Sequence, residues 1–368
     1  MKKKILICVE WLTMGGISMS LINLLNNIDI NKYDITILFT KKNVFYNDSL
    51  PKDIKIEYYN MSQSKNILFR KIINRLKLLK WIFSNKNKYD FSINYTTHNN
   101  LCATLALNSS KNNAIWVHGD YYTMYNGNEK NIKTFFNTVD LEKFKNIVFV
   151  SNKAKENIEQ IYPEIKNRML VIKNLIDYDS MVKKSNDEVE IVKEDKIVFL
   201  NVGRHTEREK NLIFLFDVIK KIKKTYNNVE LWMVGAGPDH EMYKNYVFEN
   251  GLEDTIKFLG RKENPYPYYK QADALLLTSK AEGDGIVLTE ARVLGLPVIT
   301  TDVADAVKDI ANGYGYVTEH SFDDYYNAIE KFILEGYKTK KFVAKKQNNQ
   351  MIKRFYQLID SIDGDENA

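Results

Sequence analysis

The stretch that decides the fold runs from Ser279 to Thr301, S-K-A-E-G-D-G-I-V-L-T-E-A-R-V-L-G-L-P-V-I-T-T. Glu282 and Glu290 are separated by seven residues, which include two glycines and an apolar run. The pattern predicts a loop that leads into the N-terminus of a helix closed by Gly295 and Pro297. Such an N-terminus attracts anions, whereas ionised carboxylates only accept hydrogen bonds and therefore suit sugar hydroxyls. The stretch indicates a ligand with both a diphosphate and hydroxyls, as in a nucleotide sugar.

Short apolar runs alternate with helical patterns along the chain. The runs that predict strands are Lys4–Val9, Tyr33–Phe39, Ile54–Tyr58, Phe91–Tyr95, Ala114–Val117, Ile147–Val150, Ile197–Val202, Val229–Val234, Ile256–Phe258, Ala274–Leu277 and Val298–Thr300. The patterns that predict helices between them are Leu21–Ile28, Ile67–Phe83, Leu101–Leu107, Leu212–Lys224, His240–Glu249, Pro267–Gln271 and Val287–Leu294. Near-continuous apolar strands separated by helices are typical of parallel sheets covered on both faces. Two such series predict an α/β protein with two Rossmann-like domains.

The polar segment Asp179–Lys196 lacks periodicity and indicates the domain boundary. We expect domains at residues 1–185 and 186–349, with a C-terminal helix at about 350–362 as a candidate to pack back onto the first. Asp363 and Asp365 have a metal-like spacing, but they are near the end of the chain and follow no strand, so no metal site is expected.

The charge is divided unevenly between the two halves of the 368-residue chain. Residues 1–185 carry 28 basic and 16 acidic side chains, a net charge of +12, whereas residues 186–368 carry 25 and 31, a net charge of −6. The basic half suggests an anionic surface partner. Cys8 and Cys102 lie in apolar contexts and are expected to be buried free thiols. Glu10 interrupts the apolar N-terminal run, which favours a strand over a signal peptide, and a cytoplasmic location is expected.

Glycines and basic residues follow two of the predicted strands. Asn201–Asn211, N-V-G-R-H-T-E-R-E-K-N, places Arg204 and Lys210 after Gly203. Ligands of open α/β sheets bind beyond the carboxyl ends of strands, where two cations would neutralise a diphosphate. In W-L-T-M-G-G-I, Gly15 and Gly16 follow the first strand and allow close approach of a ligand to the backbone.

Other strand ends carry weaker signals. His118 in W-V-H-G-D ends a strand and is a candidate site residue, ahead of His98 and of His205, which lies in the cationic loop. Arg261 follows another strand and is a candidate to frame a nucleobase. The turns Gly235–Pro238 and Asn264–Tyr269 are interpreted as scaffold.

The segment Lys65–Lys88 holds eight basic residues and no acidic ones. Helical periodicity places Trp81 on the side opposite an apolar stripe. A core-facing stripe with a solvated basic face is one interpretation, but an exposed Trp among basic residues is typical of a membrane interface. We expect this segment to bind an anionic membrane surface, and nucleic acid is not expected because no recognised motif accompanies the charge. The apolar stripe consists of Leu68, Ile72, Leu76, Leu79 and Phe83.

The chain resembles retaining GT-B glycosyltransferases of the family-4 type, especially those that build bacterial capsule and other surface polysaccharides. The resemblance covers nearly the whole chain. Its strongest part is E-G-D-G-I-V-L-T-E-A-R-V-L-G-L-P-V-I-T-T-D-V, supported by V-G-R-H-T-E-R-E-K-N, G-A-G-P, F-L-G-R-K-E-N-P-Y-P-Y-Y-K-Q-A-D, I-W-V-H-G-D, F-V-S-N and V-I-K-N-L-I-D.

The resemblance implies particular roles for five side chains. Glu290 would bind the ribose hydroxyls of the donor, and Glu282 a hydroxyl of the transferred sugar. Arg204 and Lys210 would hold the diphosphate, and His118 would contact the donor sugar near the reacting centre. The first domain would take the acceptor.

The remaining donor contacts are backbone and loop positions. They are Gly15, Gly16, Gly203, Arg261, Gly283, Asp284, Gly285, Ile286 and Val287.

Two departures from the family pattern matter. Asp284 replaces an apolar or aromatic residue, which is expected to alter sugar choice. The interval from Arg204 to Lys210 is one residue longer than usual, which leaves open whether Arg208 replaces Lys210 in part.

The implied reaction moves a sugar from a nucleotide-diphosphate donor, with a UDP-sugar favoured, to a glycan acceptor, with retention and without a metal or further cofactor. The acceptor is expected to be lipid-linked, and the enzyme peripheral on the inner face of the cell membrane. The alternatives are a same-fold epimerase or hydrolase, a transferase with a protein acceptor, a non-enzymatic partner subunit and a lipid-binding structural protein. The oligomeric state is left open.

Overall fold

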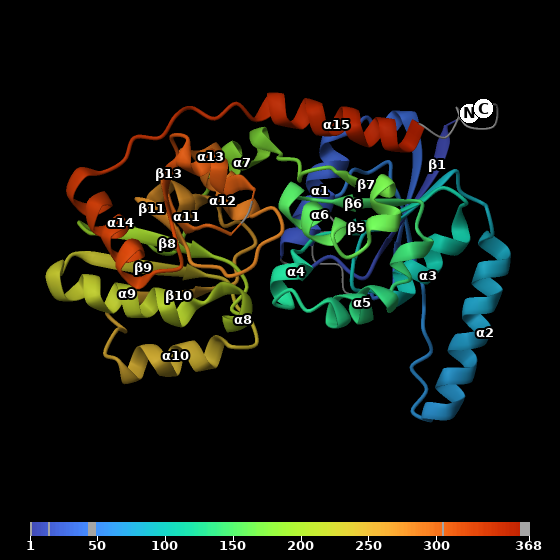
Figure 1. Cartoon of the computed structure of the whole chain (residues 1–368), viewed down its shortest axis with the longest axis horizontal. Helices are drawn as coiled ribbons and strands as arrows, with labels where there is room; N and C mark the ends of the chain where they lie inside the picture. The colour runs from blue at the N-terminus through green and yellow to red at the C-terminus, as the bar shows by residue number, and fades with distance from the viewer. Residues whose placement is uncertain (1, 14, 43–48, 304, 361–368) are drawn as a thin grey trace. The chain divides into compact units, whose positions relative to one another are not determined.

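The computed structural model describes residues 2–13, 15–42, 49–303 and 305–360, and the chain divides into two compact units (Figure 1). Unit 1 comprises residues 1–175 with 348–368, and unit 2 comprises residues 176–347. Residues 176–185 therefore pack with the second unit, although the sequence analysis assigned them to the first. Met181 of helix α7 (Tyr178–Lys184) is buried in the core of unit 2, which explains this placement. Asp363 and Asp365 lie outside the described residues.

Unit 1 is built on a seven-stranded parallel sheet. Its strands are β1 (Lys3–Val9), β2 (Tyr33–Phe39), β3 (Lys55–Tyr58), β4 (Phe91–Asn94), β5 (Asn113–Val117), β6 (Asn146–Phe149) and β7 (Met169–Val171). The strand order is β3-β2-β1-β4-β5-β6-β7, and Ile5 of β1 is in register with Ile35 of β2 and Phe91 of β4. The chain therefore reverses its direction of travel across the sheet between β1 and β4. Such a switch point is where open α/β sheets bind ligands.

Helices cover both faces of this sheet. They are α1 (Gly16–Asn27), α2 (Ile67–Asn85), α3 (Asn100–Ser109), α4 (Tyr121–Met124), α5 (Glu129–Asn137), α6 (Asn152–Glu159) and α15 (Ala344–Asp360), with 3-10 turns at Ile30–Lys32, Leu141–Lys143 and Pro163–Arg168. Each face has its own buried apolar cluster. Alternate residues of a strand point to opposite faces, so Ile5 and Ile7 lie in one cluster and Leu6 and Cys8 in the other.

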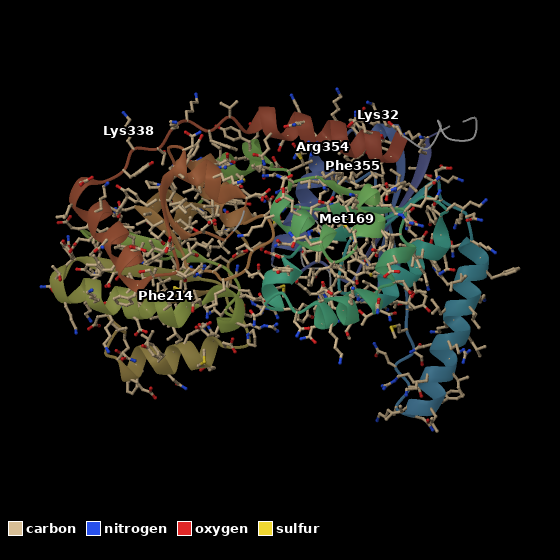
Figure 2. The ribbon with its side chains drawn as sticks, in the orientation of Figure 1. Lys32, Met169, Phe214, Lys338, Arg354 and Phe355 are labelled. Carbon is tan, nitrogen blue, oxygen red and sulfur yellow. The ribbon has the colours of Figure 1, made fainter. Side chains whose placement is uncertain are left out.

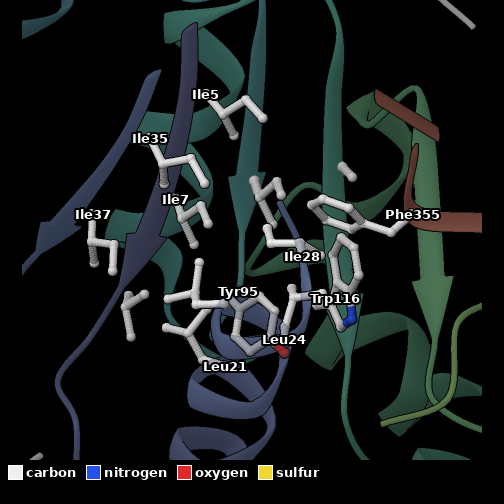
Figure 3. Packing of buried hydrophobic residues seen from close by; sticks show 14 of the residues in the cluster. Ile5, Ile7, Leu21, Leu24, Ile28, Ile35, Ile37, Tyr95, Trp116 and Phe355 are labelled. Atoms are coloured by element: carbon white, nitrogen blue, oxygen red, sulfur yellow. The ribbon is translucent and has the colours of Figure 1, made fainter. Parts of the chain in front are cut away.

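The C-terminal helix α15 packs on unit 1. The Phe355 ring lies 6.3 Å from the Trp116 ring, and Figure 3 shows both inside the apolar cluster with Ile28 and Tyr95. Arg354, labelled beside Phe355 in Figure 2, donates from Nη1 to the Val171 carbonyl oxygen at 2.8 Å. The last helix therefore completes the core of the first unit.

Helix α2 differs from its neighbours because its apolar stripe faces solvent. Trp81, expected to be exposed, is half-buried, and its ring meets that of Tyr59 edge-on at 6.5 Å. The expectation for Trp81 was therefore wrong. The periodicity correctly predicted which residues share a face, but the face that packs on the body of unit 1 is the narrow one that carries Leu78 and Trp81. Leu68, Ile72, Leu76, Leu79 and Phe83 are all exposed.

Unit 2 repeats the architecture with a six-stranded parallel sheet. Its strands are β8 (Ile197–Val202), β9 (Val229–Val234), β10 (Ile256–Gly260), β11 (Ala274–Leu277), β12 (Val298–Thr301) and β13 (Gly315–Thr318). Its helices are α7, α8 (Glu207–Lys210), α9 (Leu212–Thr225), α10 (His240–Glu249), α11 (Tyr266–Gln271), α12 (Ile286–Leu294), α13 (Ala306–Ala311) and α14 (Phe322–Glu335). The order β10-β9-β8-β11-β12-β13 puts a second switch point between β8 and β11.

The fold class expected from the sequence is confirmed: two parallel, Rossmann-like sheets. All eleven expected strands exist, within two residues at either end. The strands β7 and β13 were missed because each is short and lies at the edge of its sheet. Cys8 and Cys102 are both buried and free, as expected.

Candidate functional site

Most of the predicted donor residues lie at one edge of the unit 2 sheet. Gly203 follows β8, Arg261 follows β10, and the loop 278–285 follows β11. Because the strands are parallel, their carboxyl ends meet at the same edge. The loops after β8 and β11 flank the switch point, so segments that are about 75 residues apart in the sequence become neighbours.

The loop after β8 is held against the loop after β9. A Cβ added at Gly235 would lie 1.8 Å from the Gly203 carbonyl oxygen, so only glycine allows the two backbones to approach this closely. The His205 N–H donates to the Ala236 carbonyl oxygen at 3.2 Å. The His205 ring is fully buried, and its Nδ1 lies 2.8 Å from the Nδ1 of His240. His205 therefore shapes the loop that carries Arg204.

Lys210 and Glu282 form an ion pair that ties the loops after β8 and β11 together. The Ser279 hydroxyl also donates to Glu282 Oε1, at 2.7 Å. The Thr278 hydroxyl donates to the Lys210 carbonyl oxygen at 3.1 Å, and the Lys280 N–H to the Glu209 carbonyl oxygen at 2.8 Å. The ion pair thus joins Lys210, predicted for the diphosphate subsite, to Glu282, predicted for the sugar subsite. The two charges partly neutralise each other.

The loop after β11 ends at Gly285, which begins α12 in a left-handed conformation (φ 66°). The helix then runs from Ile286 to Leu294, so the loop-to-helix prediction is confirmed. Its first N–H groups have no partner within the helix, which makes this end suitable for an anion. Glu282 lies before the helix, and Glu290 lies in its second turn.

Glu290 is a buried carboxylate held by tyrosines of α11. It is 8% exposed, and the Tyr269 hydroxyl donates to its Oε2 at 2.7 Å. Burial raises the pKa of Glu290 to about 7, an effect that hydrogen bonds from Tyr269 and Tyr266 partly offset. Tyr266 and Tyr269 were not predicted as site residues, because the stretch N-P-Y-P-Y-Y is also typical of a scaffold turn. A signal was present, since two tyrosines three positions apart share a helix face.

The other predicted residues of unit 2 differ in exposure. Arg204, Arg208 and Arg261 are exposed, whereas Asp284 is buried. The Lys210 side chain lies over Gly203, with its Cε 3.6 Å from a Cβ placed there. This position, next to the strand end, favours Lys210 over Arg208 as the second cation of the site.

The edge of the unit 1 sheet holds His118 in a neutral form. Its Nε2 lies 2.9 Å from the Tyr95 carbonyl oxygen, and because a carbonyl only accepts, Nε2 carries the hydrogen. Burial lowers the pKa of His118 to about 4. At neutral pH its Nδ1 is therefore an acceptor, able to take a hydrogen bond from a hydroxyl.

A cluster at the switch point of unit 1 was not predicted. Glu10, directly after β1, pairs with Lys41 Nζ at 2.5 Å and with His98 Nε2 at 3.2 Å. Burial raises the pKa of Glu10, but these two partners outweigh it and the pKa is lowered overall. The same Lys41 Nζ lies 4.2 Å from the centre of the ring of Trp11, which is 37% exposed. The cluster combines an aromatic ring with hydrogen-bonding groups, a combination that small-molecule sites share.

The glycines predicted as site residues, Gly15 and Gly16, follow Glu10 and Trp11 in the chain. Gly15 precedes α1, which begins at Gly16. A Cβ added at Gly15 meets no described atom within 4 Å, so the space beside this residue is open.

Residues 182–354 match the protein family described as Glycosyl transferases group 1. An uncharacterized glycosyltransferase, MJ1059 of Methanocaldococcus jannaschii, is 28% identical to this chain. The match spans 46% of this chain and 42% of MJ1059. An uncharacterized glycosyltransferase of Haemophilus influenzae is 23% identical over 80% of this chain and 79% of its own. The capsular polysaccharide biosynthesis glycosyltransferase CapH of Staphylococcus aureus is 29% identical over 49% of this chain and 55% of its own.

Solved structures match both units. The crystal structure of Anabaena Alr3699/HepE in complex with UDP and glucose has a TM-score of 0.76 and is 18% identical, covering 96% of this chain and 99% of its own. This similarity shows the fold: two Rossmann-like domains of the GT-B type.

Metal ions and membranes each demand a particular pattern among the described residues. Within these residues, no group of three or more His, Cys, Asp or Glu side chains is arranged to hold a metal ion. None of the described helices combines the length and the apolar character needed to cross a membrane.

Proposed function

We propose that the protein transfers a sugar from a nucleotide-diphosphate donor, with a UDP-sugar favoured, to a glycan acceptor in bacterial surface polysaccharide synthesis. One observation carries the proposal. In the domain that matches group 1, the Lys210–Glu282 pair joins two segments at the switch point, and the N-terminus of α12 and buried Glu290 follow Glu282. The relative named for capsular polysaccharide biosynthesis and the structure solved with UDP and glucose support the choice of substrates.

The donor-side roles follow from the chemistry of each group. Arg204 and Lys210 bind the diphosphate together with the free N–H groups at the start of α12. Glu290, when ionised, accepts hydrogen bonds from the ribose hydroxyls, and Glu282 accepts one from the sugar. Lys210 has three N–H donors, so it can keep its bond to Glu282 while it contacts a phosphate oxygen.

The proposed transfer retains the configuration of the sugar and needs no metal. The bond between the sugar's anomeric carbon and the phosphate oxygen breaks while the acceptor oxygen bonds to that carbon from the same face. The acceptor proton passes to the leaving phosphate, and the two cations stabilise the charge that develops there. Neutral His118 of unit 1 can accept a hydrogen bond from a sugar hydroxyl.

The acceptor is proposed to be a lipid-linked glycan bound by unit 1 at the inner face of the membrane. The exposed ring of Trp11 and the polar groups of Glu10 and His98 supply an aromatic platform with hydrogen-bonding partners beside it. The two switch points would then bind the two substrates separately.

A panel of nucleotide sugars tests the proposal. Thermal shift measures binding of each donor, and nucleotide release with and without a glycan acceptor measures turnover. We expect one class of donor to stabilise the protein and release to depend on the acceptor. Release without an acceptor, with a free sugar or an epimer as product, would instead establish the hydrolase or epimerase alternative. Transfer only to protein would exclude the glycan acceptor.

A further inference from the structure

Five of the exposed apolar residues of α2 form a continuous ridge. We define the ridge as Leu68, Ile72, Leu76, Leu79 and Phe83. Each is at least 56% exposed, and Phe83 is 88% exposed. Apolar side chains scattered singly on a surface are ordinary, but a contiguous row indicates a contact surface.

The opposite side of α2 is the side that contacts the body of unit 1. Asn74 accepts a hydrogen bond from the Ser62 N–H at 2.7 Å, and Leu78 and Trp81 pack against the core. With 3.6 residues per turn, the ridge lies roughly 180° from this packed side. The ridge is therefore turned away from the core of its own unit, and Figure 1 shows α2 extending outward from unit 1.

Basic residues flank the ridge on both sides. The same helical geometry places Arg75 on one flank and Lys80 on the other. Both side chains are exposed, and the eight basic residues of Lys65–Lys88 are accompanied by no acidic residue. An apolar face bordered by cations is the pattern of a helix that lies in a membrane interface, apolar side in the acyl region and cations at the lipid phosphates.

From this arrangement we infer that α2 docks on an anionic lipid surface, with the ridge inserted and the flanking cations on the headgroups. Charge complementarity distinguishes the two candidate partners of the ridge, a second copy of α2 and an anionic bilayer. In a symmetric contact between two copies of α2, the cations flanking one ridge would face those of the other, and the like charges would repel. An anionic bilayer satisfies the cations and covers the ridge at once. The inference does not depend on the donor chemistry of unit 2.

Co-sedimentation with vesicles tests the inference. The unmodified protein should sediment with vesicles of equal parts phosphatidylcholine and phosphatidylglycerol, and not with phosphatidylcholine alone, at about 0.1 M salt. The variant Leu76→Ser/Phe83→Ser should reduce partitioning at least tenfold, roughly the loss of two inserted apolar side chains. Arg75→Glu/Lys80→Glu should reduce it by at least about tenfold as well. All four side chains are exposed, so folding should be little affected.

Matched controls are available in unit 2. Phe248→Ser/Leu334→Ser removes two apolar side chains that are 72% and 69% exposed, and Lys224→Glu/Lys244→Glu reverses two exposed charges. Neither control should change sedimentation. Equal loss in the controls, unchanged binding of the α2 variants, or no binding by the unmodified protein would overturn the inference. So would a dimer in light scattering that the Leu76→Ser/Phe83→Ser variant converts to monomer, because the ridge would then contact a second copy.

Discussion

The two switch points of this protein have the same topology but different chemistry. In unit 2 the Lys210–Glu282 pair joins the two loops at the switch point. The helix that follows, α12, carries buried Glu290, which accepts hydrogen bonds from tyrosines. In unit 1 it carries an exposed ring, Trp11, beside the Glu10 pairs. A pre-organised set of charges suits a fixed, highly charged ligand such as a diphosphate, whereas a partly exposed ring suits the face of a sugar. The comparison teaches that the same edge of a parallel sheet presents different chemistry when its loops differ.

The largest effect should come from the donor side. Glu290→Ala and Arg204→Ala should each lower the transfer rate by about two to four powers of ten, because they remove contacts to the ribose and the diphosphate. Initial rates at saturating acceptor measure this. Glu249→Ala, an exposed glutamate of α10, is the control. Near-normal turnover of both site variants would show that the switch point of unit 2 does not bind the donor.

The Lys210–Glu282 pair should show strong coupling. Lys210→Met and Glu282→Gln should each weaken donor binding by about 10- to 100-fold, since each leaves its partner largely buried and unpaired as well as removing a ligand contact. The double variant should lose much less than the sum of the two effects. Donor titration by calorimetry measures all three. Additive losses would show that the two side chains act independently.

Substitution at the other switch point should separate acceptor from donor. Trp11→Ala should reduce acceptor-dependent transfer by about tenfold, equivalent to about 1.4 kcal/mol of lost contact, and leave the donor-induced thermal shift unchanged. Tyr178→Ala in unit 2, a tyrosine that is 40% exposed, should leave both measurements unchanged. A lost donor shift in Trp11→Ala would remove the assignment of different ligands to the two units.

The smallest effect concerns the tyrosines behind Glu290. Donor affinity should rise as pH increases through about 7, because the ribose hydroxyls need the ionised carboxylate and the pKa of free Glu290 is about 7. Tyr269→Phe removes a bond that lowers this pKa, so the midpoint should move to higher pH. Donor dissociation constants between pH 6 and 9 test this. A midpoint unchanged in Tyr269→Phe would contradict the positioning role.

The same shift predicts a change in stability with a defined sign. The pKa of Glu290 is raised from 4.5 to about 7 in the folded protein, so between these values the folded state binds more protons than the unfolded state. Unfolding free energy should therefore fall as pH rises through this window. Glu290→Gln should remove that part of the fall, as urea unfolding at several pH values would show.

Much of the fold was predictable because a buried parallel strand can be recognised from its own residues. The apolar runs such as Tyr33–Phe39 and Val229–Val234 coincide with β2 and β9 because strands covered on both faces need apolar residues at most positions. The loop and helix of Ser279–Thr301 were likewise predictable, from glycine and periodicity. Short edge strands and polar helices have a weaker pattern of apolar residues. This weaker pattern explains why β7 and β13 were not predicted.

The candidate site was predictable residue by residue but not in its contacts. Lys210 and Glu282 are 72 positions apart, and no local pattern states that they pair. The same holds for Glu10 with Lys41 and for Glu290 with Tyr269. Each contact exists because the sheet topology brings distant loops to one edge.

The sequence by itself determined the two parallel sheets, the glycine loops and the periodic faces of the helices, since these depend on neighbours in the chain. Only the tertiary structure decided which face of α2 meets the core, which carboxylate pairs with Lys210 and which tyrosines hold Glu290. Periodicity defines the residues that share a face, but burial depends on which other element packs there, and that element comes from elsewhere in the chain.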